Sequence, residues 1–151
     1  MIQDSILIKN RHKRFIKTVC NSEIVWGLKN HEGFASSRSV HYEDDDGEPI
    51  GIICFWAEKA LAKSCIKDRW TKYKVTLISL SDFMENWCIG MGNDGLLVGT
   101  EFDQNLFGFE ADPYELVLDL STELKFIGKD LDFQKFQGVN DLENQVKEAF
   151  E

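Results

Sequence analysis

The stretch HYEDDDGEPIGIICFW, residues 41–56, sets an acidic segment directly before an almost wholly apolar one. The acidic segment centres on Asp46-Gly47, a dipeptide typical of turns. The apolar segment, Ile50 to Trp56, is rich in β-branched and aromatic residues, which favour a buried strand. The sequence therefore predicts a strand over Ile50–Trp56, entered through a solvated loop that carries five carboxylates: Glu43, Asp44, Asp45, Asp46 and Glu48.

Two motifs near this strand resemble ligand sites without meeting their requirements. An EF-hand loop with Gly47 at its sixth position needs an acidic ligand at position one and glutamate at position twelve. Those positions hold Tyr42 and Ile53. The string GMGNDG, residues 90–95, matches a dinucleotide-binding pattern, but a predicted helix precedes it and a strand-like segment follows, the reverse of the required order. We expect no metal and no cofactor, and a glycine turn at residues 90–95.

Upstream of the acidic loop, the pattern predicts a helix and a hairpin. Phe15, Ile16, Val19 and Cys20 form one apolar stripe of a helix from Arg11 to about Asn21. Residues 23–40 follow as two β-prone runs around the turn sequence NHEG.

Downstream, helix and strand patterns alternate irregularly. Residues 57–66 predict a helix that buries Ala57, Ala60, Leu61 and Cys65. Residues 73–80 predict a strand with Val75 and Leu77 on its apolar face, and residues 81–89 a short helix with Ser81 as N-cap. Residues 94–102 and 106–110 predict an antiparallel pair.

Near the C-terminus, DPYE gives a strong helix start, with Asp112 as N-cap and Pro113 in the first turn. Its apolar stripe is Leu116, Val117, Leu120 and Leu124. A last helix is expected from residue 140, with Asn140 as N-cap and an apolar face of Leu142, Val146, Ala149 and Phe150. Residues 125–139 show no clean period and stay unassigned.

These elements predict one α+β domain over residues 1–151, with a mostly antiparallel or mixed sheet flanked by about four helices. Four cysteines (Cys20, Cys54, Cys65 and Cys88) stand far apart among apolar residues, so we expect them to be reduced and buried. Trp26 and Trp56 are expected in the core.

The charge and hydropathy patterns limit the partners. The net charge of −9 disfavours nucleic acid, because phosphates would be repelled by most of the surface. The N-terminus lacks the order of a secretory signal, and the longest apolar run, Gly51 to Ala57, is too short to cross a bilayer. We expect a soluble cytoplasmic protein that does not associate with membranes.

The sequence offers little evidence for a catalytic site. His12, His31 and His41 are not at metal-ligand spacing, and no Ser–His or Cys–His motif occurs. We therefore expect no enzyme. A catalytic alternative would require His31 or His41 to be partly buried beside a cysteine or a carboxylate.

The order of VWGL, FWAEKALAKSC, SDFMENW and GFEADPYEL resembles a bacterial family known as domain of unknown function number 2750. The resemblance runs from about Arg14 to Glu123, which makes residues 124–151 a C-terminal helical extension. Family members often carry proline where this chain has Cys54, a change that a strand tolerates. The resemblance implies a bacterial cytoplasmic setting and an architecture, with no catalytic residues to transfer.

The sequence favours a small acidic binding protein, most concretely an immunity protein that neutralises a basic, nuclease-like toxin domain. A toxin that binds nucleic acid needs a positive cleft, which an acidic surface can occupy. The candidate partner-binding residues are the loop Glu43, Asp44, Asp45, Asp46 and Glu48 and the helix row Asp112, Glu115, Asp119 and Glu123. The alternative is a non-catalytic housekeeping or small-ligand-binding domain. Monomer and homodimer both remain open.

Overall fold

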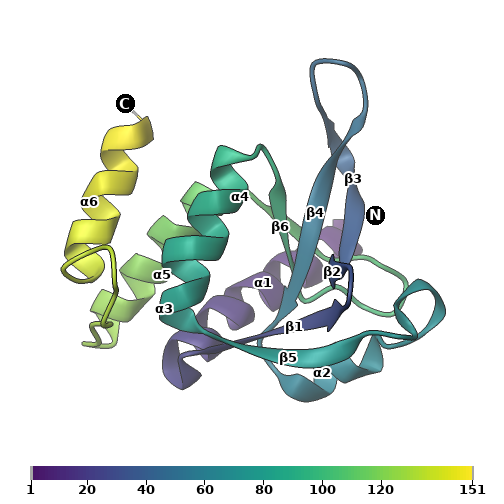
Figure 1. Ribbon diagram of the computed structural model, residues 1–151, viewed down its shortest axis with the longest axis horizontal. Coiled ribbons are helices and arrows are strands. Elements are labelled where there is room, and N and C mark those ends of the chain that lie inside the picture. The colour runs from purple at the N-terminus through teal and green to yellow at the C-terminus, as the bar shows by residue number, and fades with distance from the viewer. Residues whose placement is uncertain (1, 151) are drawn as a thin grey trace.

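The computed structural model describes residues 2–150, which form a mixed seven-stranded sheet with helices packed on both faces (Figure 1). The helices of this range are α1 Ile2–Ser22, α2 Lys59–Ser64, a continuous helix made of α3 Leu80–Asp82, the π-helical η2 Phe83–Cys88 and α4 Ile89–Asn93, then α5 Pro113–Phe126 and α6 Val139–Phe150. A single 3₁₀ turn, η1, covers Asp68–Trp70. The α+β class is confirmed.

The strands are β1 Ile24–Asn30, β2 Gly33–Phe34, β3 Ser36–Glu43, β4 Pro49–Trp56, β5 Lys74–Ser79, β6 Leu97–Thr100 and β7 Phe109–Ala111. Strand β4 is the centre of the sheet: it pairs antiparallel with β1 and β3 and parallel with β6. The pairs β1–β2, β1–β5 and β6–β7 are antiparallel. The predicted hairpins and the mixed character of the sheet are therefore confirmed.

Strand β4 is apolar throughout because both of its faces are covered. Ile52, Cys54 and Trp56 pack into a cluster with residues of α2 and η1. Ile53 and Phe55 point the other way, into the larger cluster formed by α1, the continuous helix, α5 and α6. Successive side chains of a strand alternate between faces, so a two-sided core requires an unbroken apolar run.

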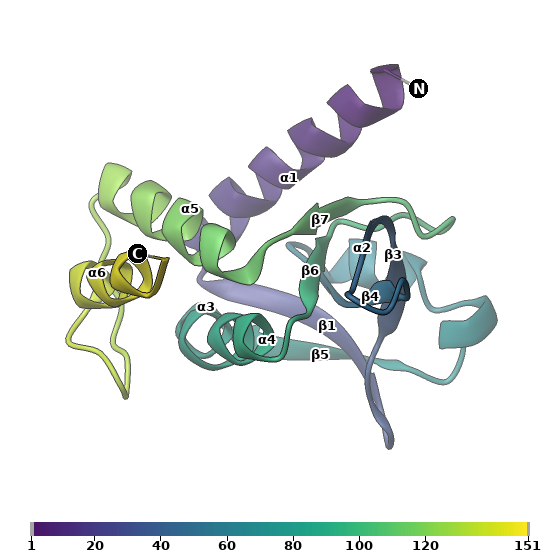
Figure 2. The same ribbon diagram turned by 90° about the horizontal axis from the view of Figure 1, so that it is seen from above.

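Several expected boundaries and faces were wrong. Helix α1 begins at Ile2 rather than Arg11, and its N-terminal half projects beyond the sheet (Figure 2). Ser79, not Ser81, caps the continuous helix by accepting a hydrogen bond from the backbone N of Asp82 at 3.2 Å. The predicted core residues Ala60, Leu61 and Leu77 are exposed.

The C-terminal region also differs in detail. The Asp112 cap is confirmed, since its carboxylate accepts from the backbone N of Tyr114 and Glu115. Helix α6 begins at Val139, which places Asn140 inside the helix rather than at its N-cap. The backbone N of Val139 donates a hydrogen bond to the carboxylate of Asp130 instead. Leu142 and Val146 are buried as predicted, whereas Ala149 is exposed. The side chain of Phe150 lies outside the described side chains.

Other expectations about the core and the turns are confirmed. All four cysteines are free and buried, and Trp56 is fully buried, although Trp26 is only half-buried. Gly95 has a φ of +72°, which lets the chain turn from α4 into β6. Within residues 2–150, no helix combines the length and apolarity needed to cross a membrane.

Candidate functional site

The acidic loop forms the tip of the β3–β4 hairpin, which rises clear of the rest of the molecule (Figure 1). Asp44 organises this loop: its carboxylate accepts from the backbone N of Asp46 at 2.9 Å and of Glu48 at 3.0 Å, and its carbonyl accepts from the backbone N of Gly47. All five carboxylates are exposed. Asp44 therefore shapes the turn, while the other four carboxylates are free to contribute charge.

The predicted acidic row on α5 is only partly a surface row. Asp112 is engaged as the helix cap. Glu115 and Asp119, one turn apart, are exposed, and Glu123 is half-buried. Three members of the row, Asp112, Glu115 and Asp119, line one hollow, and Glu123 lies outside its lining.

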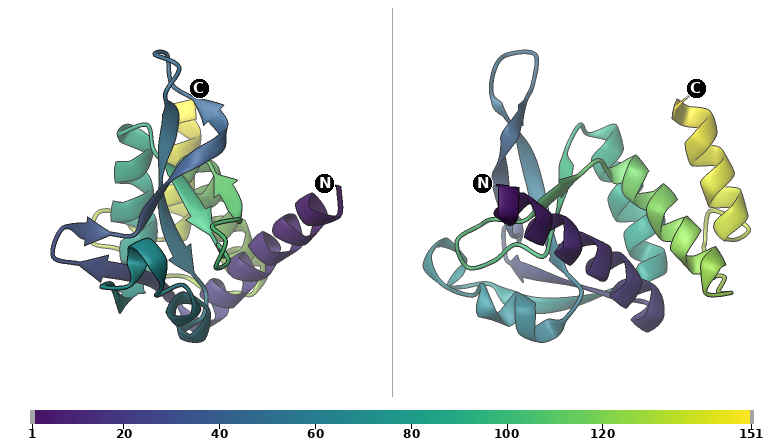
Figure 3. Two further views of the ribbon diagram at one scale, coloured as in Figure 1. Left: turned by 90° about the vertical axis from the view of Figure 1, so that its right-hand side faces the viewer. Right: turned by 180° about the vertical axis from the view of Figure 1, so that it is seen from behind.

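This hollow, which we call the acidic cleft, has a volume of about 510 Å³. One wall is the part of the β3–β4 hairpin next to its acidic loop, through Tyr42 and Ile50, and the opposite wall is the first half of α5. Strands β6 and β7 and one side chain of α1, His12, close it between these walls. Seen from behind, the hairpin and α5 stand on either side of the sheet edge (Figure 3). The two predicted acidic surfaces thus belong to elements that border one cleft.

Glu110 of β7 fixes the hairpin wall of the cleft. Its carboxylate accepts a hydrogen bond from the Ser39 hydroxyl and another from the backbone N of Val40 at 3.2 Å. Ser39 Oγ in turn accepts from the backbone N of His41 and Tyr42. This network crosses from β7 to β3 and holds Tyr42 beside the cleft, a role that sequence reasoning missed.

His12 lies at the inner end of the cleft and is only 7% exposed. Its Nδ1 is 2.7 Å from Thr100 Oγ1, and its ring stacks on Phe109 with 3.9 Å between ring centroids. Burial lowers the pKa of His12 to about 4, so the ring is neutral at pH 7. The sequence contained evidence for the burial of His12, because this residue extends the apolar stripe of Phe15, Ile16 and Val19 by one helical turn. Its basic neighbours made a solvent-exposed position the expected one.

Burial of His12 makes the stability depend on pH. The folded-state pKa of about 4 lies below the unfolded value of 6.5, so between these pH values the unfolded chain binds a proton that the folded chain does not. Stability is therefore complete above pH 6.5 and falls as the pH drops toward 4, by roughly 3 kcal/mol in all. Urea unfolding between pH 7 and 5 should show a flatter pH dependence for His12→Asn than for the parent chain.

The matched control for this experiment is His31→Asn, because His31 is exposed. The carboxylates of the protein are the same in all three chains, so their titration cancels in the comparison. Equal pH slopes for His12→Asn and the parent chain would contradict the assignment.

The other two histidines do not meet the condition set for a catalytic site. His31 and His41 are both exposed. His31 Nε2 lies 3.6 Å from Oε1 of Glu32, which is exposed as well. Among residues 2–150, no three His, Cys, Asp or Glu side chains gather in a group that could hold a metal ion.

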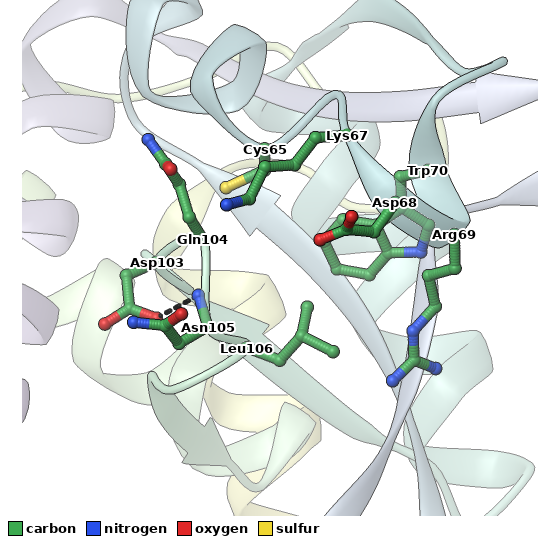
Figure 4. Close-up of a pocket in the computed structure, with 9 residues that line it drawn as sticks. All are labelled: Cys65, Lys67, Asp68, Arg69, Trp70, Asp103, Gln104, Asn105 and Leu106. Atoms are coloured by element: carbon green, nitrogen blue, oxygen red, sulfur yellow. Dashed lines mark hydrogen bonds between the residues drawn. The ribbon is translucent and has the colours of Figure 1, made fainter.

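A second hollow of about 310 Å³ lies between the turn after α2 and the β6–β7 connection (Figure 4). It contains cations and carboxylates together, from Lys67, Asp68, Arg69 and Asp103. The Cys65 thiol donates to the carbonyl of Phe102 at 3.3 Å, and burial raises its pKa. A protonated thiol is a weak nucleophile, and mixed charges select no class of ligand. The acidic cleft is therefore the better-defined candidate.

Comparison with known proteins adds one match. Residues 12–120 match a family model described as "Protein of unknown function (DUF2750)". The match covers β1 to β7, the C-terminal half of α1 and the first half of α5, and so includes residues of every element that borders the acidic cleft. No curated protein and no solved structure shows a significant match.

Proposed function

The chain belongs to the DUF2750 family, whose function is unknown, and from its acidic cleft we propose that it is a non-catalytic binding protein for a basic protein partner. The observation that carries this proposal is that carboxylates of β7 and α5 line one cleft beside a hairpin tipped by five more. A single face of this kind attracts a positively charged surface.

In this proposal, the hairpin tip and the cleft contribute to binding in different ways. The exposed carboxylates at the hairpin tip act at long range, because their field extends over about 10 Å at 0.1 M salt. The cleft acts at contact, where Tyr42 and Phe109 offer apolar rings next to Glu115 and Asp119. Long-range attraction raises the association rate, and close contacts determine the lifetime of the complex.

In its most concrete form, the proposed partner is the nucleic-acid-binding domain of a toxin, which would make this protein an immunity protein in the bacterial cytoplasm. A nuclease must present cations to phosphates, and the acidic face would cover them. The alternative is a housekeeping protein whose cleft holds a small organic cation, because a cleft of this volume is in the range of small-molecule sites.

Affinity capture at low and high salt, followed by mass spectrometry, tests the proposal. The wild-type chain is expected to retain a stoichiometric basic protein at low salt and to release it as salt rises. The test variant reverses Glu43, Asp45, Asp46 and Glu48 to lysine. It keeps Asp44, because that residue forms the turn. We expect this variant to bind the captured protein at least tenfold more weakly.

The matched control reverses four exposed acidic residues away from the cleft, Glu32, Glu58, Asp132 and Glu148, so that the net charge is the same. Equal weakening by both variants would show that only net charge matters and would refute the assigned face. Failure to capture a basic protein even when candidate toxin domains are supplied in purified form would favour the small-cation alternative.

A further inference from the structure

The inner end of the acidic cleft holds a polar atom without a partner. His12 is 93% buried by its 7% exposure, and its Nδ1 is occupied by Thr100. Within residues 2–150, nothing hydrogen-bonds its other ring nitrogen, Nε2. Within this range, Arg11 Nε is the one fully buried side-chain nitrogen or oxygen that lacks a hydrogen-bond partner. His12 Nε2 also lacks a partner, so it is not fully buried and keeps some contact with solvent. Since His12 lines the cleft, Nε2 is open to it.

The neutral ring makes Nε2 a hydrogen-bond acceptor when Nδ1 carries the proton and donates it to Thr100 Oγ1. A ligand with an N–H group selects this tautomer. Burial keeps the ring neutral, as its lowered pKa shows, so Nε2 does not repel a cation at neutral pH.

The α5 wall supplies the opposite charge. The carboxylates of Glu115 and Asp119 make no hydrogen bond or ion pair with another described residue, unlike those of Glu110 and Asp112. Asp119 remains open to solvent, yet the protein around it removes part of its hydration and raises its pKa. Two unpaired carboxylates one helical turn apart thus line the same cleft as the ring of His12.

The aromatic rings restrict the cation further. Phe109 stacks on His12, and Tyr42 lies on the hairpin wall. A guanidinium group is planar, stacks on aromatic rings, and has five N–H donors that reach several acceptors at once. An ammonium group has three donors on one atom and stays strongly hydrated, so it fits these separated acceptors less well.

We propose that the acidic cleft is a subsite for one arginine side chain of the partner, with His12 Nε2 and the carboxylates of Glu115 and Asp119 as its acceptors. The inference rests on the proposed function and specifies which residue of the basic partner enters the cleft. The hairpin tip has no part in it, so the two can be tested separately.

The experiment is an NMR titration of the ¹⁵N-labelled protein with agmatine, a small guanidinium compound, against putrescine. Both probes carry two positive charges, but putrescine has only amines. Agmatine is expected to shift the His12 ring-nitrogen and Phe109 resonances saturably, with at least tenfold higher affinity than putrescine. Equal affinities would overturn the assignment to arginine.

Variants separate the acceptors from general charge. Glu115→Gln with Asp119→Asn should weaken agmatine binding at least tenfold, and His12→Asn should weaken it several-fold, with thermal unfolding confirming that each variant is folded. The control, Glu32→Gln with Asp132→Asn, removes the same charge from two exposed positions outside the cleft lining and should leave agmatine binding unchanged. If the cleft variants bind agmatine as tightly as the wild type, the subsite is refuted.

The cleft variants and the hairpin-tip lysine variant together distinguish this failure from failure of the proposed function. A basic partner that still depends on the hairpin tip, with agmatine unbound, would reject the arginine subsite alone. Agmatine bound at the cleft, with no basic protein recognised, would reject the proposed function and leave a small-cation site.

Discussion

Trp56→Ala is expected to lower the free energy of unfolding by about 3–5 kcal/mol, the range for removing a large buried aromatic side chain. Trp56 is fully buried at the end of β4. Its indole Nε1 donates to the carbonyl of Phe102 at 2.9 Å, and its ring meets Trp70 edge to face, with 6.0 Å between centroids. The substitution therefore opens a cavity where β4, η1 and the β6–β7 connection meet.

Urea unfolding followed by circular dichroism measures this loss. Trp56→Phe keeps most of the apolar volume and removes the indole donor, so we expect a smaller loss of about 1–2 kcal/mol. The Phe102 carbonyl still accepts from the Cys65 thiol, which limits the cost. Leu61→Ala, at an exposed position, should change the stability by less than about 0.5 kcal/mol. A loss below about 1 kcal/mol for Trp56→Ala would contradict the described packing.

Glu85→Ala is expected to lower the free energy of unfolding by about 2–4 kcal/mol, because it leaves two partly buried backbone donors without their charged acceptor. Glu85 belongs to the π-helical segment and is only 4% exposed. Its carboxylate accepts from the backbone N of Gln134 and from that of Lys135, at 2.9 to 3.2 Å. The carboxylate thus anchors residues 127–138, which connect α5 to α6, to the continuous helix.

Two readouts test this anchor. Chemical unfolding gives the loss in stability, and limited proteolysis reports whether residues 127–138 become accessible before the rest of the chain unfolds. Glu85→Gln retains one acceptor oxygen and should lose less than the alanine variant. Glu148→Ala, at an exposed position of α6, is the control and should be neutral. Resistance of Glu85→Ala to proteolysis at the level of the control would refute the anchoring role.

The features predicted correctly from the sequence depend on neighbours in the chain. Asp112 and Pro113 form a cap within one turn, and the Asp-Gly turn and the apolar run that forms the buried strand β4 are equally local. The buried residues of the continuous helix were harder to predict. A π-helical segment shifts the register of the side chains, so Phe83, Met84 and Glu85 are all buried in succession, which no α-helical stripe predicts.

The candidate site was predictable in part, for the same reason. The exposure of Glu115 and Asp119 on one face of α5 follows from helical spacing. The cleft opposite them does not, because it requires the Glu110–Ser39 contact between β7 and β3, and the approach of α1. His12 joins a residue of α1 to Thr100 of β6, a contact between distant parts of the chain. Contacts of this kind depend on the tertiary fold.

The parallel pairing of β4 with β6 also has a consequence for synthesis on the ribosome. The two strands are separated in sequence by residues 57–96, so β6 leaves the ribosome only after α2, β5 and the continuous helix. Until then, one edge of β4 has no strand beside it, and an uncovered apolar edge is a template for pairing with other chains. The nascent chain is therefore most exposed to aggregation in the interval between the emergence of Trp56 and that of Thr100.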